Sequence, residues 1–318
     1  MSVESSEAAV RPPVAARRHT QRTVHGHTLV DDYAWLQEKE NPEVIAYLEA
    51  ENAWCSQVMA GTEDLQKQLY EEMRSHIKET DISVPFRDRD YWYYSRTEEG
   101  KQYEFFCRKR GTAEGPTGEE EVLLDVNELA EHEPFMALGT MVISDDGNLL
   151  AYSCDNRGFR QYKLYVKNLR TGEVLKQHVD RVGSVVWAAD NKTLFYTVED
   201  EEQKRQFQFF RHNIEKPFTE AELVYEEKDE RFNIGAGRTR DDKYIILESS
   251  SHTTTEEKIL PADEPRGTWR MIEPRREEIE YYADHRNGQL YIRTNDTGRN
   301  FRLVTAPIDA PGRENWTA

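Results

Sequence analysis

One pattern returns four times in the later part of the chain: a polar turn followed at once by a short run of β-forming residues. The runs cover 149–152, 193–196, 244–247 and 289–292. Measured between Leu150, Leu194, Ile245 and Leu290, the steps are 44, 51 and 45 residues, and Trp92 lies 58 residues before Leu150. Periods of about 40 to 50 residues with several strands in each unit are typical of a β-propeller.

Each unit is expected to hold four strands. A first strand precedes the turn, a third follows a charged loop, and an outer strand comes last. In the fifth unit the outer strand is only beginning at Trp316-Thr317-Ala318. The sequence therefore predicts a mostly β fold: an incomplete β-propeller of about four and a half four-stranded blades, too few to close a ring. A stacked β-solenoid is the structural alternative, but its repeats are usually shorter.

The first 80 residues have helical periodicity instead of alternation. Asn41-Pro42-Glu43 combines a cap, a proline at the first helical position and an acid in the first turn. Gly61 should end this helix, and Thr62 should cap a second one with an apolar stripe at four-residue spacing: Leu65, Leu69, Met73 and Ile77. We therefore expect an extended and helical arm over 1–80 and a partial propeller over 81–318.

Net charge and cysteine content exclude some classes of function. The 42 basic and 60 acidic residues give a net charge of −18, which argues against nucleic-acid binding. A cationic ligand is one explanation of the acidity, and simple solubility is the other. No apolar run is long enough for a membrane helix or resembles a signal peptide, and the three scattered cysteines suggest neither disulfides nor zinc. We expect a cytoplasmic protein without cofactors.

No residues for catalysis, cofactor binding or metal binding can be assigned. The chain has no GxSxG motif, and Ser249-Ser250-Ser251-His252 places a serine beside a histidine only in sequence, which does not make a triad. His25-Gly26-His27 lacks a third ligand and is expected to be a surface turn. Three acidic runs are expected in solvated hairpin loops, where no burial would shift a pKa: 98–99, 119–121 and 199–202.

Several motifs resemble the prolyl oligopeptidase family. The arm carries Asp31-Asp32-Tyr33-Ala34-Trp35-Leu36 and Asn41-Pro42-Glu43-Val44, which are similar to the family's amino-terminal signature. Later motifs resemble its oligopeptidase B branch: Tyr91-Trp92-Tyr93-Tyr94-Ser95-Arg96, Asp229-Glu230-Arg231-Phe232, Ser249-Ser250-Ser251-His252-Thr253-Thr254 and Arg293-Thr294-Asn295-Asp296. The resemblance covers nearly all of the chain after about residue 12.

This resemblance implies the front part of a serine oligopeptidase. Family members join a seven-bladed propeller, which limits substrate size, to an α/β-hydrolase domain with a Ser-Asp-His triad. The oligopeptidase B branch cleaves short peptides after Lys or Arg. Because the triad would lie beyond residue 318, the chain alone is expected to be inactive. Its expected partners are the missing hydrolase domain and, through the parent enzyme, short basic peptides, but neither nucleic acid nor membranes.

Two further expectations follow. The arm should clasp the hydrolase domain, so its side chains Trp35, Tyr47, Leu48 and Trp54 should be exposed or loosely packed here. The alternative function is a noncatalytic propeller module that binds peptides or proteins.

Overall fold

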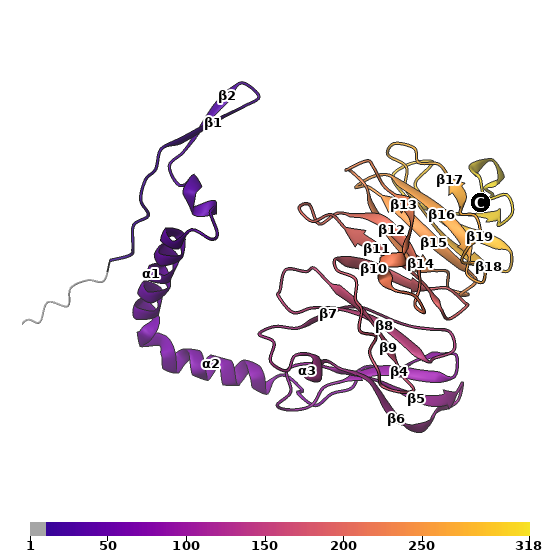
Figure 1. Ribbon diagram of the computed structural model, residues 1–318, viewed down its shortest axis with the longest axis horizontal. Helices are drawn as coiled ribbons and strands as arrows, with labels where there is room; N and C mark the ends of the chain where they lie inside the picture. The colour runs from indigo at the N-terminus through magenta and orange to yellow at the C-terminus, as the bar shows by residue number, and fades with distance from the viewer. Residues whose placement is uncertain (1–10) are drawn as a thin grey trace, which may run out of the picture. The chain divides into compact units, whose positions relative to one another are not determined.

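The computed structural model describes residues 11–318, which divide into two compact units, one up to Glu79 and one from Thr80 onward. The first unit begins with an antiparallel hairpin of β1 (Thr20–Val24) and β2 (His27–Asp31) and a 3-10 turn, η1 (Ala34–Gln37). Two helices follow, α1 (Pro42–Met59) and α2 (Glu63–Ser75), joined by the 3-10 turn η2 (Ala60–Thr62) (Figure 1).

The expected helix start is confirmed. Asn41 is the N-cap of α1, and its side-chain oxygen accepts a hydrogen bond from the backbone N–H of Glu43 at 3.0 Å. Thr62 occupies the N-cap position of α2, but its hydroxyl donates to the carbonyl of Met59 instead of accepting a backbone N–H. The stripe Leu65, Leu69, Met73 and Ile77 is exposed.

The expectation that Trp35 is exposed or loosely packed is wrong. Leu48 is exposed and Tyr47 and Trp54 are half-buried, but Trp35 retains only 7% of its accessible surface. The arm itself buries this indole: Nε1 donates to the carbonyl of Ala16 at 2.8 Å, and the Arg18 guanidinium lies 4.2 Å from the ring centroid. Trp35 is therefore buried partly by Ala16, which is 19 positions away in sequence, and helical periodicity does not indicate this contact.

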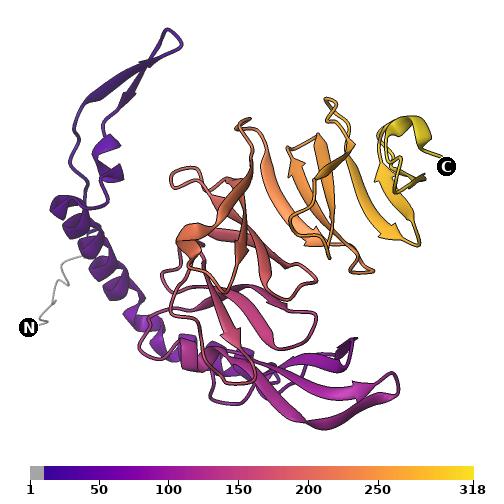
Figure 2. The same ribbon diagram turned by 45° about the vertical axis from the view of Figure 1, so that its right-hand side comes forward.

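The second unit contains five antiparallel sheets that follow one another in sequence order (Figures 1 and 2). The first two sheets contain, in order, β3 (Phe86–Asp88), β4 (Tyr91–Arg96), β5 (Phe105–Thr112) and β6 (Gly115–Asp125), then β7 (Ala137–Ile143), β8 (Leu149–Asp155) and β9 (Lys163–Asn168). A short helix, α3 (Val126–Leu129), connects them.

The third sheet contains β10 (Val182–Trp187), β11 (Thr193–Glu199), β12 (Gln206–Asn213) and β13 (Glu222–Glu226). The fourth contains β14 (Asn233–Arg238), β15 (Tyr244–Ser250), β16 (Thr255–Pro261) and β17 (Arg270–Glu273), and the fifth contains β18 (Tyr281–Arg286), β19 (Gln289–Thr294) and β20 (Arg302–Pro307). The 3-10 turns η3 (Phe218–Glu220) and η4 (Arg313–Asn315) lie in the third and fifth units. The predicted mostly β fold with its helical arm is thus confirmed.

Two outer strands differ from the others. In the second sheet, the expected outer strand is reduced to two isolated bridges, Lys167↔Val174 and Leu164↔Val179. In the fifth, the single bridge Thr305↔Thr317 marks the outer strand expected to begin near Trp316.

Each pair of neighbouring sheets shares its own hydrophobic core. Trp187 and Leu194 of the third sheet, for example, pack with Ala151, Leu164 and Val166 of the second. Further clusters join the first and second sheets, the third and fourth, and the fourth and fifth. Stability is therefore distributed over interfaces between adjacent repeats, as in other repeat proteins.

The turns between the first and second strands share one backbone feature. Each contains a residue with positive φ: Arg89 (50°), Gly147 (72°), Asn191 (57°), Asp242 (60°) and Asn287 (50°). Asn, Asp and Gly adopt this conformation readily, which explains the polar turns in the repeat. We call the end of the sheets that carries these turns the turn end, and the opposite end, with the loops between second and third strands, the loop end.

Candidate functional site

A group of ion pairs at the turn end connects three of the five sheets. The Nη2 atom of Arg89 lies 2.9 Å from Oδ1 of Asp145 and 2.8 Å from Oδ2 of Asp242. Arg238 reaches the same Asp145 carboxylate, with Nη1 at 2.9 Å from Oδ1, and also contacts the Asp242 carbonyl. Burial raises the pKa of Asp242, while the two guanidinium groups oppose that rise. Charged side chains therefore bridge these turns and also line a cavity of about 460 Å³.

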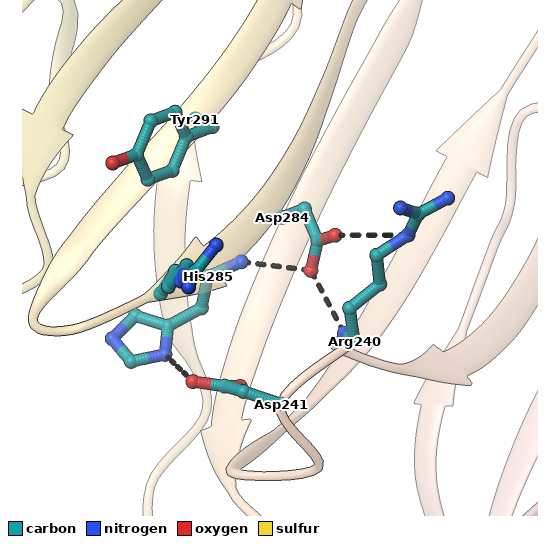
Figure 3. A pocket seen from close by; sticks show the side chains of 6 residues that line it. Arg240, Asp241, Asp284, His285 and Tyr291 are labelled. Atoms are coloured by element: carbon teal, nitrogen blue, oxygen red, sulfur yellow. Dashed lines mark hydrogen bonds and ion pairs between the residues drawn. The ribbon is translucent and has the colours of Figure 1, made fainter.

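A second polar contact at the turn end joins the fourth and fifth sheets (Figure 3). Nδ1 of His285 lies 2.7 Å from Oδ2 of Asp241. Nε2 of His285 lies 3.1 Å from the backbone nitrogen of Gly288. Because Gly288 N–H can only donate, Nε2 accepts and the ring proton is on Nδ1, which donates to Asp241. Hydrogen bonds from Thr239 and His285 lower the pKa of Asp241 against the effect of burial.

These residues border an open cavity of about 410 Å³. Its other lining residues are Arg240, Asp284, Arg286 and Tyr291, and Arg240 donates its backbone N–H to Asp284 at 2.9 Å. An Asp-His pair can act as a general base when the second ring nitrogen is free. Here that nitrogen is occupied by Gly288, so the pair holds a turn in place and does not offer a base to a substrate.

At the loop end, Arg275 contacts residues of two of the sequence motifs. Phe232, from Asp229-Glu230-Arg231-Phe232, lies against Arg275 with the guanidinium 4.0 Å from the ring centroid. Ser249, from the serine-rich motif, donates to Oε2 of Glu227 at 2.5 Å, and Arg275 Nη2 lies 2.5 Å from the same oxygen. Burial opposes ionisation of Glu227, but Arg275 and Ser249 bring its pKa down to about 2.

A cavity of about 470 Å³ lies over this cluster. Its lining residues are Arg231, Phe232, Ser251, His252, Thr253, Thr254, Arg275 and Glu277. The buried charges beneath it are paired, because Arg275 also contacts Glu256 at 3.3 Å. The cluster therefore stabilises the loop between β13 and β14 against the fourth sheet.

The serine-rich stretch does not form a nucleophilic site. The Ser249 hydroxyl is buried and donates to a carboxylate, whereas His252 is exposed in the turn between β15 and β16. Ser251 closes that turn by donating its backbone N–H to Thr254 at 2.8 Å. A hydrolase nucleophile needs a base that can take up its proton, whereas the Glu227 carboxylate beside Ser249 is paired with Arg275, which helps to keep its pKa at about 2.

His25 and His27 are exposed at the turn of the β1–β2 hairpin, as expected. Within residues 11–318, no group of three or more His, Cys, Asp or Glu side chains is placed to hold a metal ion. Cys55, Cys107 and Cys154 are all free thiols. The described part of the chain also has no helix that is long and apolar enough to cross a membrane.

The expectation for the acidic runs needs correction. Glu119, Glu120 and Glu121 lie within β6, where Glu120 accepts from the Tyr94 hydroxyl at 2.6 Å and Glu121 pairs with Arg108 at 2.7 Å. Glu199 is buried at the end of β11, and burial raises its pKa. Glu120 and Glu121 pair with arginines on other strands of the same sheet, whereas Glu199 is covered by the packing of its sheet. Neither outcome can be read from a run of acids.

The comparisons with known proteins agree with this architecture. Residues 12–318 match the family model described as "Prolyl oligopeptidase, N-terminal beta-propeller domain". Dipeptidyl aminopeptidase BI of Pseudoxanthomonas mexicana is 39% identical over 97% of this chain and 45% of its own length. Protease 2 of Moraxella lacunata is 34% identical over 93% of this chain and 44% of its own length.

Solved structures give the same result. Oligopeptidase B from Trypanosoma brucei, with covalently bound antipain, is similar at a TM-score of 0.85 and 31% identity over 95% of this chain and 45% of that one. Oligopeptidase B from Leishmania major has a TM-score of 0.87 and 27% identity over the same shares. The chain thus spans less than half the length of these relatives.

Proposed function

The chain belongs to the prolyl oligopeptidase family, and from this membership we propose that it is the propeller part of a serine peptidase that hydrolyses short peptides after Lys or Arg. The family match over residues 12–318 is the observation that carries the proposal. The likeness to two oligopeptidase B structures supports the choice of branch. The acidic net charge of −18 is suited to attracting cationic peptides.

In this proposal the chain has two parts with different tasks. Residues 1–80 form the arm that clasps an α/β-hydrolase domain, and residues 81–318 form the partial propeller. The exposed stripe of Leu65, Leu69, Met73 and Ile77 supports the first assignment, since a helix normally buries such a face. The hydrolase domain supplies the nucleophile, the base and the oxyanion hole, so this chain alone is inactive. The whole protein works in the cytoplasm, where its free thiols remain reduced.

The propeller limits substrate size through charged side chains that bridge its turns. Arg89 and Arg238 join carboxylates from the second and fourth sheets at the turn end, which supports such a restriction. The chain enters the β unit at the other end, where Thr80 accepts a hydrogen bond from Glu99 in the β4–β5 loop. We therefore place the hydrolase domain at the loop end.

Two experiments test the proposal. Reading the coding sequence beyond Ala318 should reveal an in-frame hydrolase sequence with GxSxG, whereas a stop codon there would favour a noncatalytic binding module. The chain joined to that domain should cleave peptides with an internal Lys or Arg, and the chain alone should not. Two kinds of substrate serve as controls: peptides with Pro in place of the basic residue, and peptides from which only a free amino-terminal dipeptide can be removed. Preference for either kind would contradict cleavage after Lys or Arg.

The size limit needs its own measurement. A series of peptides with one Arg and increasing length should lose kcat/KM beyond a threshold in the whole enzyme. Equal cleavage of a folded protein and a short peptide with the same scissile sequence would contradict a filtering role.

A further inference from the structure

The turn between β18 and β19 contains Asn287-Gly288, the one Asn-Gly pair in the sequence. Asn-Gly is the sequence most prone to deamidation, because glycine has no side chain to hinder attack by its own backbone nitrogen. In this reaction Gly288 N loses its proton and bonds to Cγ of Asn287, and the side-chain nitrogen leaves as ammonia. Water then opens the succinimide ring at either carbonyl, leaving aspartate or isoaspartate at position 287. Both residues are exposed, so water can reach them.

The geometry of the turn opposes this attack. Arg286 pairs directly with Gln289, so the turn has two central residues, and their φ angles of 50° and 78° are those of a type I′ turn. In such a turn ψ of the first central residue is about +30°. At that angle the following nitrogen points away from Cβ of Asn287, whereas ring closure requires the two to lie on the same side. The 287–288 peptide plane must therefore rotate before Gly288 N can reach Cγ.

That rotation would break a specific contact. Gly288 N–H donates to Nε2 of His285 at 3.1 Å, and the His285 tautomer that accepts it is held by Asp241 at 2.7 Å. His285 is 4% exposed and its ring lies 4.6 Å from that of Tyr244, so the imidazole cannot follow the turn outward. The Gly288 carbonyl is held as well, by the backbone N–H of Ile308 at 3.0 Å.

We propose that Asn287 is a deamidation site and that the Asp241–His285 pair slows its deamidation in the folded chain. The pair comes from two different sheets, so protection depends on the contact between the fourth and fifth sheets (Figure 3). Conversion to isoaspartate would add a methylene to the backbone between paired Arg286 and Gln289 and a negative charge to the turn. The modification would therefore damage the same contact that prevents it.

The test follows deamidation at Asn287 in the purified 318-residue chain at mildly alkaline pH, by the gain of one mass unit in the peptide that contains it and by isoaspartate assay. The folded chain should react much more slowly than the chain in concentrated urea. His285→Ala should raise the folded-state rate about fivefold, the factor expected for loss of one hydrogen bond worth about 1 kcal/mol. Asp241→Asn should raise it less, because Nε2 can still accept.

Arg240→Ala is the matched control, since Arg240 is in the same turn as Asp241 and its side chain is 93% exposed. It should leave the rate unchanged. Equal rates in folded and urea-unfolded wild type would overturn the proposal, as would an unchanged rate in a folded His285→Ala chain. A slower rate in that variant would show instead that His285 acts as the base for the reaction. If His285→Ala does not fold, the deamidation rate of His285→Gln is measured instead. The glutamine amide oxygen can accept from Gly288 N–H, so this variant should deamidate as slowly as the wild type, and a rate as fast as in urea would contradict the proposal.

Discussion

Arg89 and Asp242 lie 153 residues apart in the chain, yet Nη2 of the arginine is 2.8 Å from Oδ2 of the aspartate. The pair connects the first and fourth sheets, and Arg89 also contacts Asp145 of the second. Neighbouring sheets share apolar cores, whereas the first and fourth sheets, which are not neighbours, are linked by this ion pair.

Arg89→Ala should therefore lower the free energy of unfolding only modestly, by about 1 kcal/mol or less, because its side chain is 34% exposed. The loss should shrink at high salt, where exposed ion pairs are screened. Urea unfolding at low and high salt measures both effects. Arg87→Ala, in the exposed strand β3, is the control and should be nearly neutral. A salt-independent loss would show that Arg89 acts by packing instead.

Arg275→Ala should be far more damaging, by about 3–5 kcal/mol, because it leaves the Glu227 carboxylate buried without its cation. Glu227 is 4% exposed, and the Phe232 ring would also lose the guanidinium packed on it. Thermal or urea unfolding measures the change. Arg231→Ala, whose partner Asp229 is at the surface, is the matched control. Similar losses in the two variants would contradict a buried role for the Arg275 pair.

The same cluster should make stability depend on pH. The pKa of Glu227 falls from its usual 4.5 to about 2 in the folded state. The unfolded chain therefore binds more protons between these values, so this contribution is complete above about pH 4.5 and is lost as the pH falls toward 2. Glu227→Gln should flatten the pH dependence of the unfolding free energy in that window. An unchanged slope would mean that Glu227 is not the responsible group.

Glu257 should have the opposite effect. It is buried in β16, accepts a hydrogen bond from the Ala283 N–H at 2.9 Å, and burial raises its pKa well above 4.5. Here the folded chain binds more protons, so stability falls as the pH rises above about 4.5 by about 1.4 kcal/mol for each unit of pKa shift. Glu257→Gln keeps the acceptor without the charge and should stabilise the chain at neutral pH. Glu226→Gln, at an exposed site, is the control; destabilisation by Glu257→Gln would refute the charge argument.

In the 318-residue chain, the fifth sheet should be the least protected part of the β unit. Leu303 of β20 is 60% exposed, and within residues 11–318 the outer side of this strand is paired only through the bridge Thr305↔Thr317. Amide hydrogen exchange and limited proteolysis should show lower protection from Asp284 onward than in β11 or β15. Equal protection would show that the sheet is stabilised by contacts other than these.

Local patterns determined much of the fold in advance. Alternating residues and polar turns indicated the second strands at Leu150, Leu194, Ile245 and Leu290, because strand periodicity and left-handed turns depend on near neighbours in sequence. The cap at Asn41 was predicted for the same reason.

Tertiary structure alone decided the polar contacts that join the sheets. Nothing near Arg89 in sequence indicates Asp145 or Asp242, and nothing near His285 indicates Asp241, because each pair forms only when separate repeats stack side by side. Trp35 is likewise buried by residues that are distant in sequence, Ala16 and Arg18. A repeat pattern specifies each sheet through preferences between residues that are close in sequence. The partner of a charged or aromatic side chain depends instead on how separate sheets or segments are positioned, and short-range preferences do not determine that.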